Sequence, residues 1–240
     1  MKTVSLNRWE KAQKLEFEYW RNTAKDPLEI ARIIQEKVVA AHFAEINIPT
    51  ISNLSGQFVE IGIGPLGVGC VHFLSGSASR ESIGIEPLPL MVYGGLPLPL
   101  ASLVKDCQER FRYIQTKGEK IGLKDGTVSF IACYNVIDHC HDPASVLNEA
   151  FRLLRSGGYI LVGCDVISWL SMAKYHLYAK RYRSNTPLVI CHPYRFTARS
   201  LIKLMGKAQF TVVAYNKRSY EMVRQVVGRG YRYLIVAKKN

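Results

Sequence analysis

The 240-residue sequence contains no long hydrophobic run. Its nearest approach, residues 88–104, is broken by three prolines and by the pair Gly94-Gly95. This segment falls short of the roughly 18–20 uninterrupted apolar residues that cross a bilayer as a helix. The first eight residues also lack the apolar segment of a signal peptide. We therefore expect a cytoplasmic protein with no transmembrane segment.

Closely paired cysteines are also missing. The six cysteines show no C-x-x-C spacing, which is common in zinc and redox sites. In a cytoplasmic protein we expect them to be reduced thiols in the core. The residues His139-Cys140-His141 are of types that can bind a metal ion, but we expect no metal site.

Acidic residues are scarce in the last part of the chain. From Ser171 to Asn240 there are 15 Lys and Arg residues and one acid, Glu221. The net charge of the whole chain is +13, so the positive charge is concentrated in this section. Such asymmetry favours an anionic partner: nucleic acid, a phosphorylated substrate or an acidic membrane surface. Basic helices exposed to solvent would give the same pattern.

The remaining pattern indicates an α/β fold with an N-terminal helical cap at residues 1–50. The cap shows helical periodicity, and a second helix is expected to start at Asp26-Pro27. Strands are expected at residues 58–63, 82–86, 128–133, 159–163, 210–215 and 232–237, and helices from the glycine-rich turn to residue 74 and at 101–114, 142–154 and 197–207. This alternation is typical of a mostly parallel, doubly wound sheet.

The stretch from Phe58 to Gly69 organises the candidate site. A strand containing Glu60 leads into a turn rich in glycine, where the absence of Cβ atoms lets backbone N–H groups approach a ligand. Such a turn alone also suits NAD- and FAD-binding folds. Glu86 ends the second strand about twenty residues later, where a carboxylate can accept both hydroxyls of a ribose.

Further motifs follow in a fixed order. They are Gly118-Glu119, Asn135-Val136-Ile137-Asp138-His139, Asp142-Pro143, Leu153-Leu154-Arg155-Ser156-Gly157-Gly158 and His192-Pro193-Tyr194-Arg195-Phe196-Thr197. With the glycine turn, they resemble the class I S-adenosylmethionine-dependent methyltransferases, in particular the small-molecule branch called type 11. The resemblance implies a Rossmann-like, seven-stranded sheet, a methyltransferase domain at residues 51–240 and S-adenosylmethionine as cofactor.

The resemblance also implies roles for single residues. The cofactor-binding residues would be Glu60, Gly62, Ile63, Gly64, Gly67, Glu86, Pro87, Gly118, Glu119 and Asn135. Within this set, Glu60 would act through the turn and the methionyl ammonium group, directly or by water. Glu86 would hold the ribose, and Gly118 and Glu119 would lie at the adenine edge.

Histidines after the fourth expected strand are the candidates for chemistry. We predict His139 as the catalytic residue, because histidine is suited to act as a base near neutral pH. A helix inserted after the fifth strand of the fold, at about residues 166–190, is expected to recognise the methyl acceptor. The predicted substrate-binding residues are His141, Tyr175, Tyr178, Tyr182, His192 and Tyr194.

The predicted function is methylation of a small molecule, with oxygen as the favoured acceptor atom. A sugar, a phosphorylated metabolite or an aromatic natural product would suit the aromatic and basic residues of the inserted helix. Alternatives are an RNA methyltransferase, a non-catalytic S-adenosylmethionine-binding partner protein and a contact with an acidic membrane. Nucleic acid is less favoured, because there is no N-P-P-Y-like tetrad for a flipped-out base. The sequence does not indicate the oligomeric state.

Overall fold

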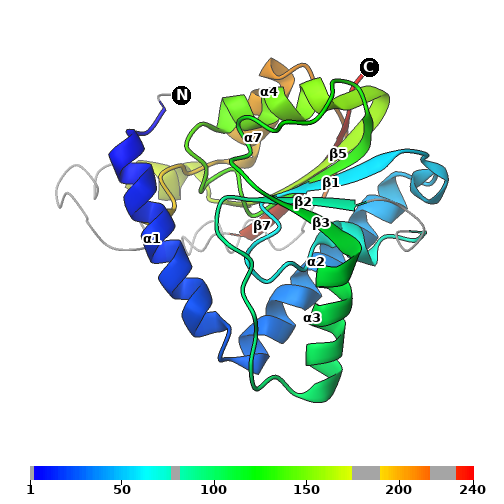
Figure 1. Ribbon diagram of the computed structural model, residues 1–240. Coiled ribbons are helices and arrows are strands. Elements are labelled where there is room, and N and C mark those ends of the chain that lie inside the picture. Colours follow the sequence, from blue (N-terminus) through cyan, green and yellow to red (C-terminus); the bar gives the residue numbers. More distant parts are fainter. Residues whose placement is uncertain (1–2, 77–81, 175–189, 217–230) are drawn as a thin grey trace.

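A seven-stranded sheet forms the centre of the computed structural model, which describes residues 3–76, 82–174, 190–216 and 231–240 (Figure 1). The strands are β1 (Gln57–Ile61), β2 (Ser82–Glu86), β3 (Phe111–Gln115), β4 (Val128–Tyr134), β5 (Leu154–Val166), β6 (Thr211–Tyr215) and β7 (Tyr231–Lys238). Their order is β3-β2-β1-β4-β5-β7-β6. The pairs from β3 to β5 are parallel, and β7 is antiparallel to both of its neighbours. The expected Rossmann-like sheet is therefore confirmed as a mixed sheet of seven strands.

Helices lie above and below the sheet in Figure 1. They are α1 (Leu6–Thr23), α2 (Pro27–Asn47), α3 (Leu98–Arg110), α4 (Pro143–Leu153) and α7 (Ala198–Lys207), with short 3-10 helices η1 (Ile51–Asn53) and η2 (Cys70–Phe73). Leu147 of α4 and Leu201 of α7 belong to one apolar cluster with the sheet. Ala40 of α2 belongs to another, with Phe58 and Phe130. The middle strands are buried on both faces and therefore read as continuous apolar runs.

Three helices begin close to the starts expected from the sequence, each after a capping side chain. Asp26 accepts hydrogen bonds from the backbone N–H groups of residues 28 and 29, and Pro27 is the first residue of α2. Asp142 caps α4 in the same way. Thr197 and Ser200 form a reciprocal capping box at α7.

The helix expected after the glycine turn is wrong, because only the short η2 forms there. Gly62, Gly64 and Gly67 have φ values of 70°, 82° and 68°, in a region that α-helices do not use. The N–H group of Val71 donates to the carboxylate of Glu60 at 3.0 Å, not to a carbonyl one helical turn earlier. Side-chain bonding therefore replaces the helical bond.

The expected helix at residues 101–114 is also partly wrong. The helix ends at Arg110, and the next five residues form β3. This segment pairs with β2 in parallel register, from Phe111 opposite Ser82 to Gln115 opposite Glu86. A non-local pairing therefore overrides the local helical pattern.

The two N-terminal helices pack in different ways. Helix α2 lies against the sheet, and α1 runs past the side of it in Figure 1. A cap formed by residues 1–50 therefore stays a prediction. Residues 169–174 of the expected inserted helix are helical, and Tyr175, Tyr178 and Tyr182 lie outside the described residues. Within the described ranges, no helix has the length and hydropathy of a membrane span.

A buried ion pair joins α2 to β1. The Lys37 ammonium donates to Glu60 Oε1 at 2.9 Å and to the carbonyl of Ile63 at 2.9 Å. The two charged side chains are only 6% and 0% exposed. Burial would lower the pKa of Lys37, but the neighbouring Glu60 carboxylate outweighs this effect and raises it. The pair is therefore charged and sets the position of the turn relative to α2.

Removing one partner of this pair should leave an uncompensated buried charge. We expect Lys37→Met to lower the free energy of unfolding by about 3–5 kcal/mol, measured by urea denaturation. Lys37→Met combined with Glu60→Leu should recover part of that loss. Arg32→Gln is the control on the same helix, because Arg32 pairs with Glu29 at the surface and should cost about 0–1 kcal/mol. Equal losses for Lys37→Met and Arg32→Gln would contradict this role.

Candidate active site

Two adjoining pockets lie at the carboxyl ends of β1, β2 and β4. We call them the narrow pocket, of about 100 Å³, and the wide pocket, of about 550 Å³. Predicted cofactor residues that line the narrow pocket are Gly62, Gly64, Glu86, Pro87, Gly118, Glu119 and Asn135. The two pockets share Glu16, Trp20, Gly62, Gly64, Asn135 and His139. They therefore form two compartments of one site, joined at the glycine turn and the end of β4.

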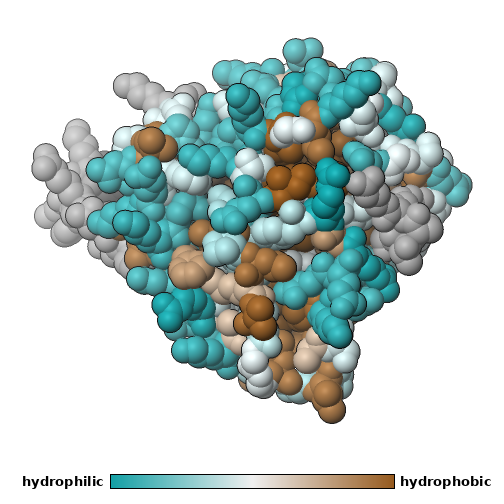
Figure 2. All heavy atoms as spheres, in the orientation of Figure 1, coloured by the Kyte–Doolittle hydropathy of each residue, from teal (hydrophilic) through white to brown (hydrophobic). Residues whose placement is uncertain are grey.

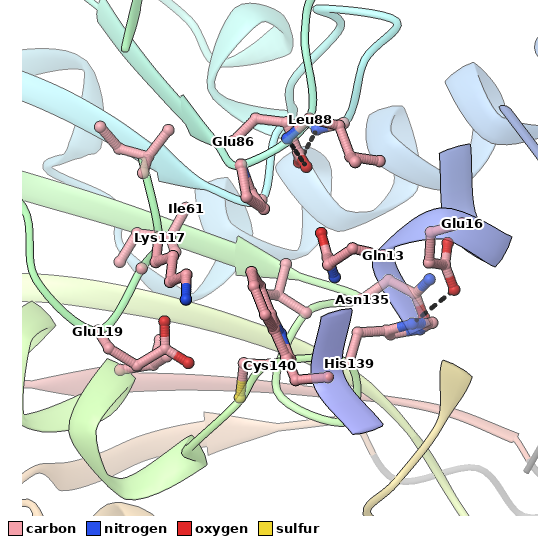
Figure 3. Close-up of a pocket in the computed structure, with 18 of the residues that line it drawn as sticks. Gln13, Glu16, Ile61, Glu86, Leu88, Lys117, Glu119, Asn135, His139 and Cys140 are labelled. Carbon is pink, nitrogen blue, oxygen red and sulfur yellow. Dashed lines mark hydrogen bonds and ion pairs between the residues drawn. The ribbon is translucent and has the colours of Figure 1, made fainter. Parts of the chain in front are cut away.

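Glu86 is a buried acid in the narrow pocket. Its carboxylate accepts hydrogen bonds from the backbone N–H groups of Gly64 at 3.0 Å and Leu88 at 3.2 Å. Burial raises the pKa of Glu86 to about 7, although these two bonds oppose the shift. In Figure 3, Glu86 lies above the pocket, with Lys117 and Glu119 to the left. Each carboxylate oxygen still has a lone pair for a ligand.

Glu119 lies on the opposite side of the narrow pocket and binds the backbone there. Its carboxylate accepts hydrogen bonds from the N–H groups of His141 at 2.8 Å and Asp142 at 3.0 Å, just before α4. The Lys117 ammonium lies 3.9 Å from the centre of the Trp9 ring, in cation–π geometry. Lys117 and Trp9 therefore close this end of the narrow pocket.

Helix α1 supplies one side of both pockets. Trp9, Gln13, Glu16 and Trp20 line the narrow pocket at intervals of three or four residues, so they share one helical face. Gln13 and Glu16 are absent from the residues predicted as the site. Their spacing with the two tryptophans is the signal that would have identified them. The carboxylate of Glu16 lies 3.0 Å from His139 Nδ1, and Figure 3 shows this contact.

His139 belongs to a compact group of charged side chains. Asp138 Oδ2 lies 2.8 Å from His192 Nδ1 and 3.7 Å from His139 Nε2. The centres of the two imidazole rings are 4.0 Å apart. Asp138 is almost fully buried, whereas both histidines line the wide pocket. The fold therefore joins two predicted site residues, His139 and His192, through an acid that the sequence analysis did not select.

The charges of this group oppose the predicted role of His139 as a base. Burial would lower the pKa of His139, but the charge of Asp138 and the contact with Glu16 raise it to about 9. Burial likewise opposes ionisation of Asp138, and the two histidines lower its pKa below the usual range. At neutral pH, His139 is therefore protonated in this arrangement and does not accept a proton.

Asn135 lies where β4 ends and lines both pockets. Its φ of 60° is unusual for a residue other than glycine, and its N–H donates to the carbonyl of Gly163 at 2.7 Å. The Asn135 side chain accepts a hydrogen bond of 2.6 Å from Arg232, which also pairs with Asp165 at 2.9 Å. Arg232 comes from β7, and no local motif indicates its place in the wide pocket.

Among the predicted site residues that the structure describes, four line neither pocket: Glu60, Gly67, His141 and Tyr194. Glu60 is paired with Lys37 under the turn. A Cβ atom on Gly67 would lie 2.8 Å from Leu90. The Tyr194 hydroxyl donates to the carbonyl of His141 at 2.6 Å, so this tyrosine connects backbone segments. By contrast, Ile63 and His192 line the wide pocket.

A segment with exposed apolar side chains follows β2. Pro87 and Leu88 line the pocket, and the same segment continues to Val92 and Leu98, which are strongly exposed. Figure 2 shows hydrophobic surface from the centre of this face to its lower end. Leu88 therefore borders the pocket near the start of a segment that carries exposed apolar side chains.

Comparison with known proteins points to one family. Residues 60–162 match the family described as "Methyltransferase domain". Two relatives called "Uncharacterized methyltransferase", from Mycobacterium sp. strains KMS and JLS, are 30% identical over 115 residues and 32% identical over 114 residues. Each match covers 47% of this chain but only 39% of the relative. The matched part is therefore about two-fifths of those relatives' length.

Solved structures show the same fold at low identity. One is 1,6-didemethyltoxoflavin-N1-methyltransferase from Burkholderia thailandensis, with bound 1,6-didemethyltoxoflavin and S-adenosylhomocysteine. It has a TM-score of 0.61 at 15% identity, over 100% of this chain and 92% of that chain. Geranyl diphosphate C-methyltransferase from Streptomyces coelicolor has a TM-score of 0.57 at 11% identity, over 89% of this chain and 84% of that chain. Residues 60–162 are therefore similar to a methyltransferase domain, and the chain has the same fold as these two solved methyltransferases.

Proposed function

We propose that this chain is an S-adenosylmethionine-dependent methyltransferase that acts on a small molecule, with oxygen as the methyl acceptor. The observation that carries this proposal is the junction between the two pockets. Because they share Gly62, Gly64, Asn135 and His139, a ligand lying in the narrow pocket would reach the wide pocket at the glycine turn. That arrangement brings a cofactor and an acceptor together.

The residues of the narrow pocket fit an adenosine group. Glu86 offers lone pairs for two ribose hydroxyls, and the turn at Gly62 and Gly64 brings backbone close to the ligand. The indole N–H of Trp9 is buried and has no hydrogen-bond partner among the described residues. A buried donor without a partner is costly, so a polar ligand atom at this position would stabilise the site.

Bound S-adenosylmethionine would supply an electrophilic methyl group. The residues of the chain would hold the acceptor in line with it and exclude water. Trp20 and Glu16 of α1 lie at the junction and cover it from one side. His139 would contact the acceptor there. The positive charge of its ring, beside an acceptor oxygen, would favour the ionised, more nucleophilic form of that oxygen.

The wide pocket suits a polar or aromatic acceptor. Its volume of about 550 Å³ lies within the range of small-molecule sites. Tyr19 and Tyr134 contribute aromatic surface. Its cations Arg32, Lys37 and Arg232 all pair with carboxylates, which weakens the argument for an anionic acceptor. The two structural neighbours described above bind small molecules, which also supports this class of substrate.

The labelling pattern of cell extract would test this function. The chain is incubated with S-adenosylmethionine carrying a labelled methyl group and with fractionated extract. We expect label in the small-molecule fraction. Label in RNA would favour the alternative suggested by the basic C-terminal section. Binding of S-adenosylhomocysteine without transfer to any fraction would favour a non-catalytic partner protein.

Replacing His139 should affect transfer more than cofactor binding. We expect His139→Gln to lower the rate of methyl transfer about 10–100-fold, because it removes a positive charge that would favour ionisation of the acceptor oxygen. Affinity for S-adenosylhomocysteine, measured by calorimetry, should change little. His42→Gln, an exposed histidine on α2, is the control and should have unchanged transfer. Normal turnover by His139→Gln would exclude the catalytic role.

Glu86 should make cofactor affinity depend on pH. Its pKa of about 7 in the free protein means that the carboxylate loses its proton as pH rises through 7. Ribose hydroxyls favour the ionised form, so affinity for S-adenosylhomocysteine should rise with pH and fall up to about tenfold per unit below pH 7. Calorimetry from pH 5.5 to 8.5 would measure this dependence.

The comparison variant for this experiment is Glu86→Gln. It keeps the shape of the side chain but cannot ionise, so its affinity should be weaker and less dependent on pH. Lys37 and Glu16 also act electrostatically on Glu86 and are unchanged in both proteins. The same pH slope in both proteins would show that Glu86 does not hold the cofactor.

A further inference from the structure

We propose that Asp138, His139 and His192 form a binding site for a divalent transition-metal ion in the wall of the wide pocket. One ligand atom from each residue lies within 4.8 Å of the other two. This spacing is close to that around a bound ion, where metal–nitrogen and metal–oxygen distances are about 2.0–2.2 Å. The fold brings His192 to the Asp138-His139 pair from 54 residues further along the chain.

Glu16 orients His139 for this role. Its carboxylate lies 3.0 Å from Nδ1, so the ring donates that proton to Glu16 and directs the other nitrogen, Nε2, toward Asp138. Histidine ligands of metal ions commonly donate their second ring N–H to a carboxylate in this way. Nε2 is buried and has no hydrogen-bond partner within the described ranges. A metal ion would give this nitrogen a partner.

The charge of the cluster also favours a cation. Asp138 is only 2% exposed, and a buried carboxylate must be paired or bind a metal. Glu16 places a second carboxylate on the other side of His139. Arg232 of β7, which acts electrostatically on His139, already pairs with Asp165 and Glu36. A divalent ion would displace the proton that His139 carries in the free protein and would balance the two carboxylates.

The ligand types indicate the class of ion. Two imidazoles and one carboxylate suit Zn²⁺, Co²⁺ or Fe²⁺, and suit Mg²⁺ or Ca²⁺ poorly. Three protein ligands leave at least one open coordination position, as in catalytic metal sites. His139 and His192 both line the wide pocket, so that position would face the acceptor. This role toward an acceptor rests on the proposed function, whereas binding of the ion does not.

Titration of the tag-free protein with Co²⁺ would test the site. Visible absorption reports the Co²⁺ environment, and calorimetry with Zn²⁺ reports stoichiometry. We expect one ion per chain with micromolar or tighter affinity, and displacement of Co²⁺ by Zn²⁺. His192→Gln and Asp138→Asn should each weaken binding by about 100-fold or abolish it. Glu16→Gln should weaken it about 10–100-fold, because it removes the group that orients His139.

Two controls make the result decisive. His42→Gln removes an exposed histidine of α2 and should bind the ion as the unchanged protein does. Circular dichroism and thermal unfolding without metal would show that each variant is folded. If Asp138→Asn is unfolded, the metal affinity of His192→Gln tests the proposal. The His192 side chain is partly exposed, so its replacement should leave the protein folded.

Two outcomes would overturn the proposal. One is the absence of stoichiometric binding to the unchanged protein. The other is equal affinity in the unchanged protein, His192→Gln and any folded Asp138→Asn. Either result would leave Asp138, His139 and His192 as a hydrogen-bonded network only. Because no methyl acceptor is used, the result does not depend on whether the chain transfers methyl groups.

Discussion

The ion pair between Lys37 and Glu60 is the contact on which the geometry of the glycine turn depends. Burying two charges costs several kcal/mol for each ion, and this cost is offset only where the remaining donors and acceptors are also paired. Here they are paired with the turn itself, through the carbonyl of Ile63 and the N–H of Val71. A Cβ atom on Gly69 would lie 2.4 Å from Glu60 Oε2, so only glycine leaves room for the carboxylate. Helix α2, which precedes the sheet in the chain, therefore fixes the backbone of the glycine turn.

Local interactions explain which parts of the fold were predictable. A cap such as Asp26 bonds to residues two and three positions away, so its effect is visible in sequence. The position of Glu86 at the pocket was also predictable, because a residue at the carboxyl end of a strand lies at the ligand-binding edge of a parallel sheet. The two wrong predictions concern segments whose structure depends on contacts with residues distant in the sequence. Pairing with β2 makes β3 a strand, and the Glu60 carboxylate takes the N–H of Val71 that a helix would have used.

Distant contacts also decide which residues of the candidate site could be predicted from the sequence. Side chains alternate between the two faces of a strand, but a strand buried on both faces shows no alternation in its sequence. The sequence therefore does not reveal that Glu60 faces α2 and not the pocket. The narrow pocket was largely predictable, because each βα connection carries its own motif. The wide pocket was less predictable: His192 was among the predicted residues, but Arg232 reaches this pocket from the last strand without a local motif.

Helix α1 both lines the two pockets and contacts the proposed catalytic residue His139. The same helical face that carries Trp9 and Trp20 over the pockets also carries Glu16, which holds His139 by a 3.0 Å contact. Glu16→Gln would remove the charge of this carboxylate from beside His139. His139 would then lose one of the two carboxylates that raise its pKa and orient its ring. Helix α1 therefore contributes both to the wall of the pockets and to the charge and orientation of the proposed catalytic residue.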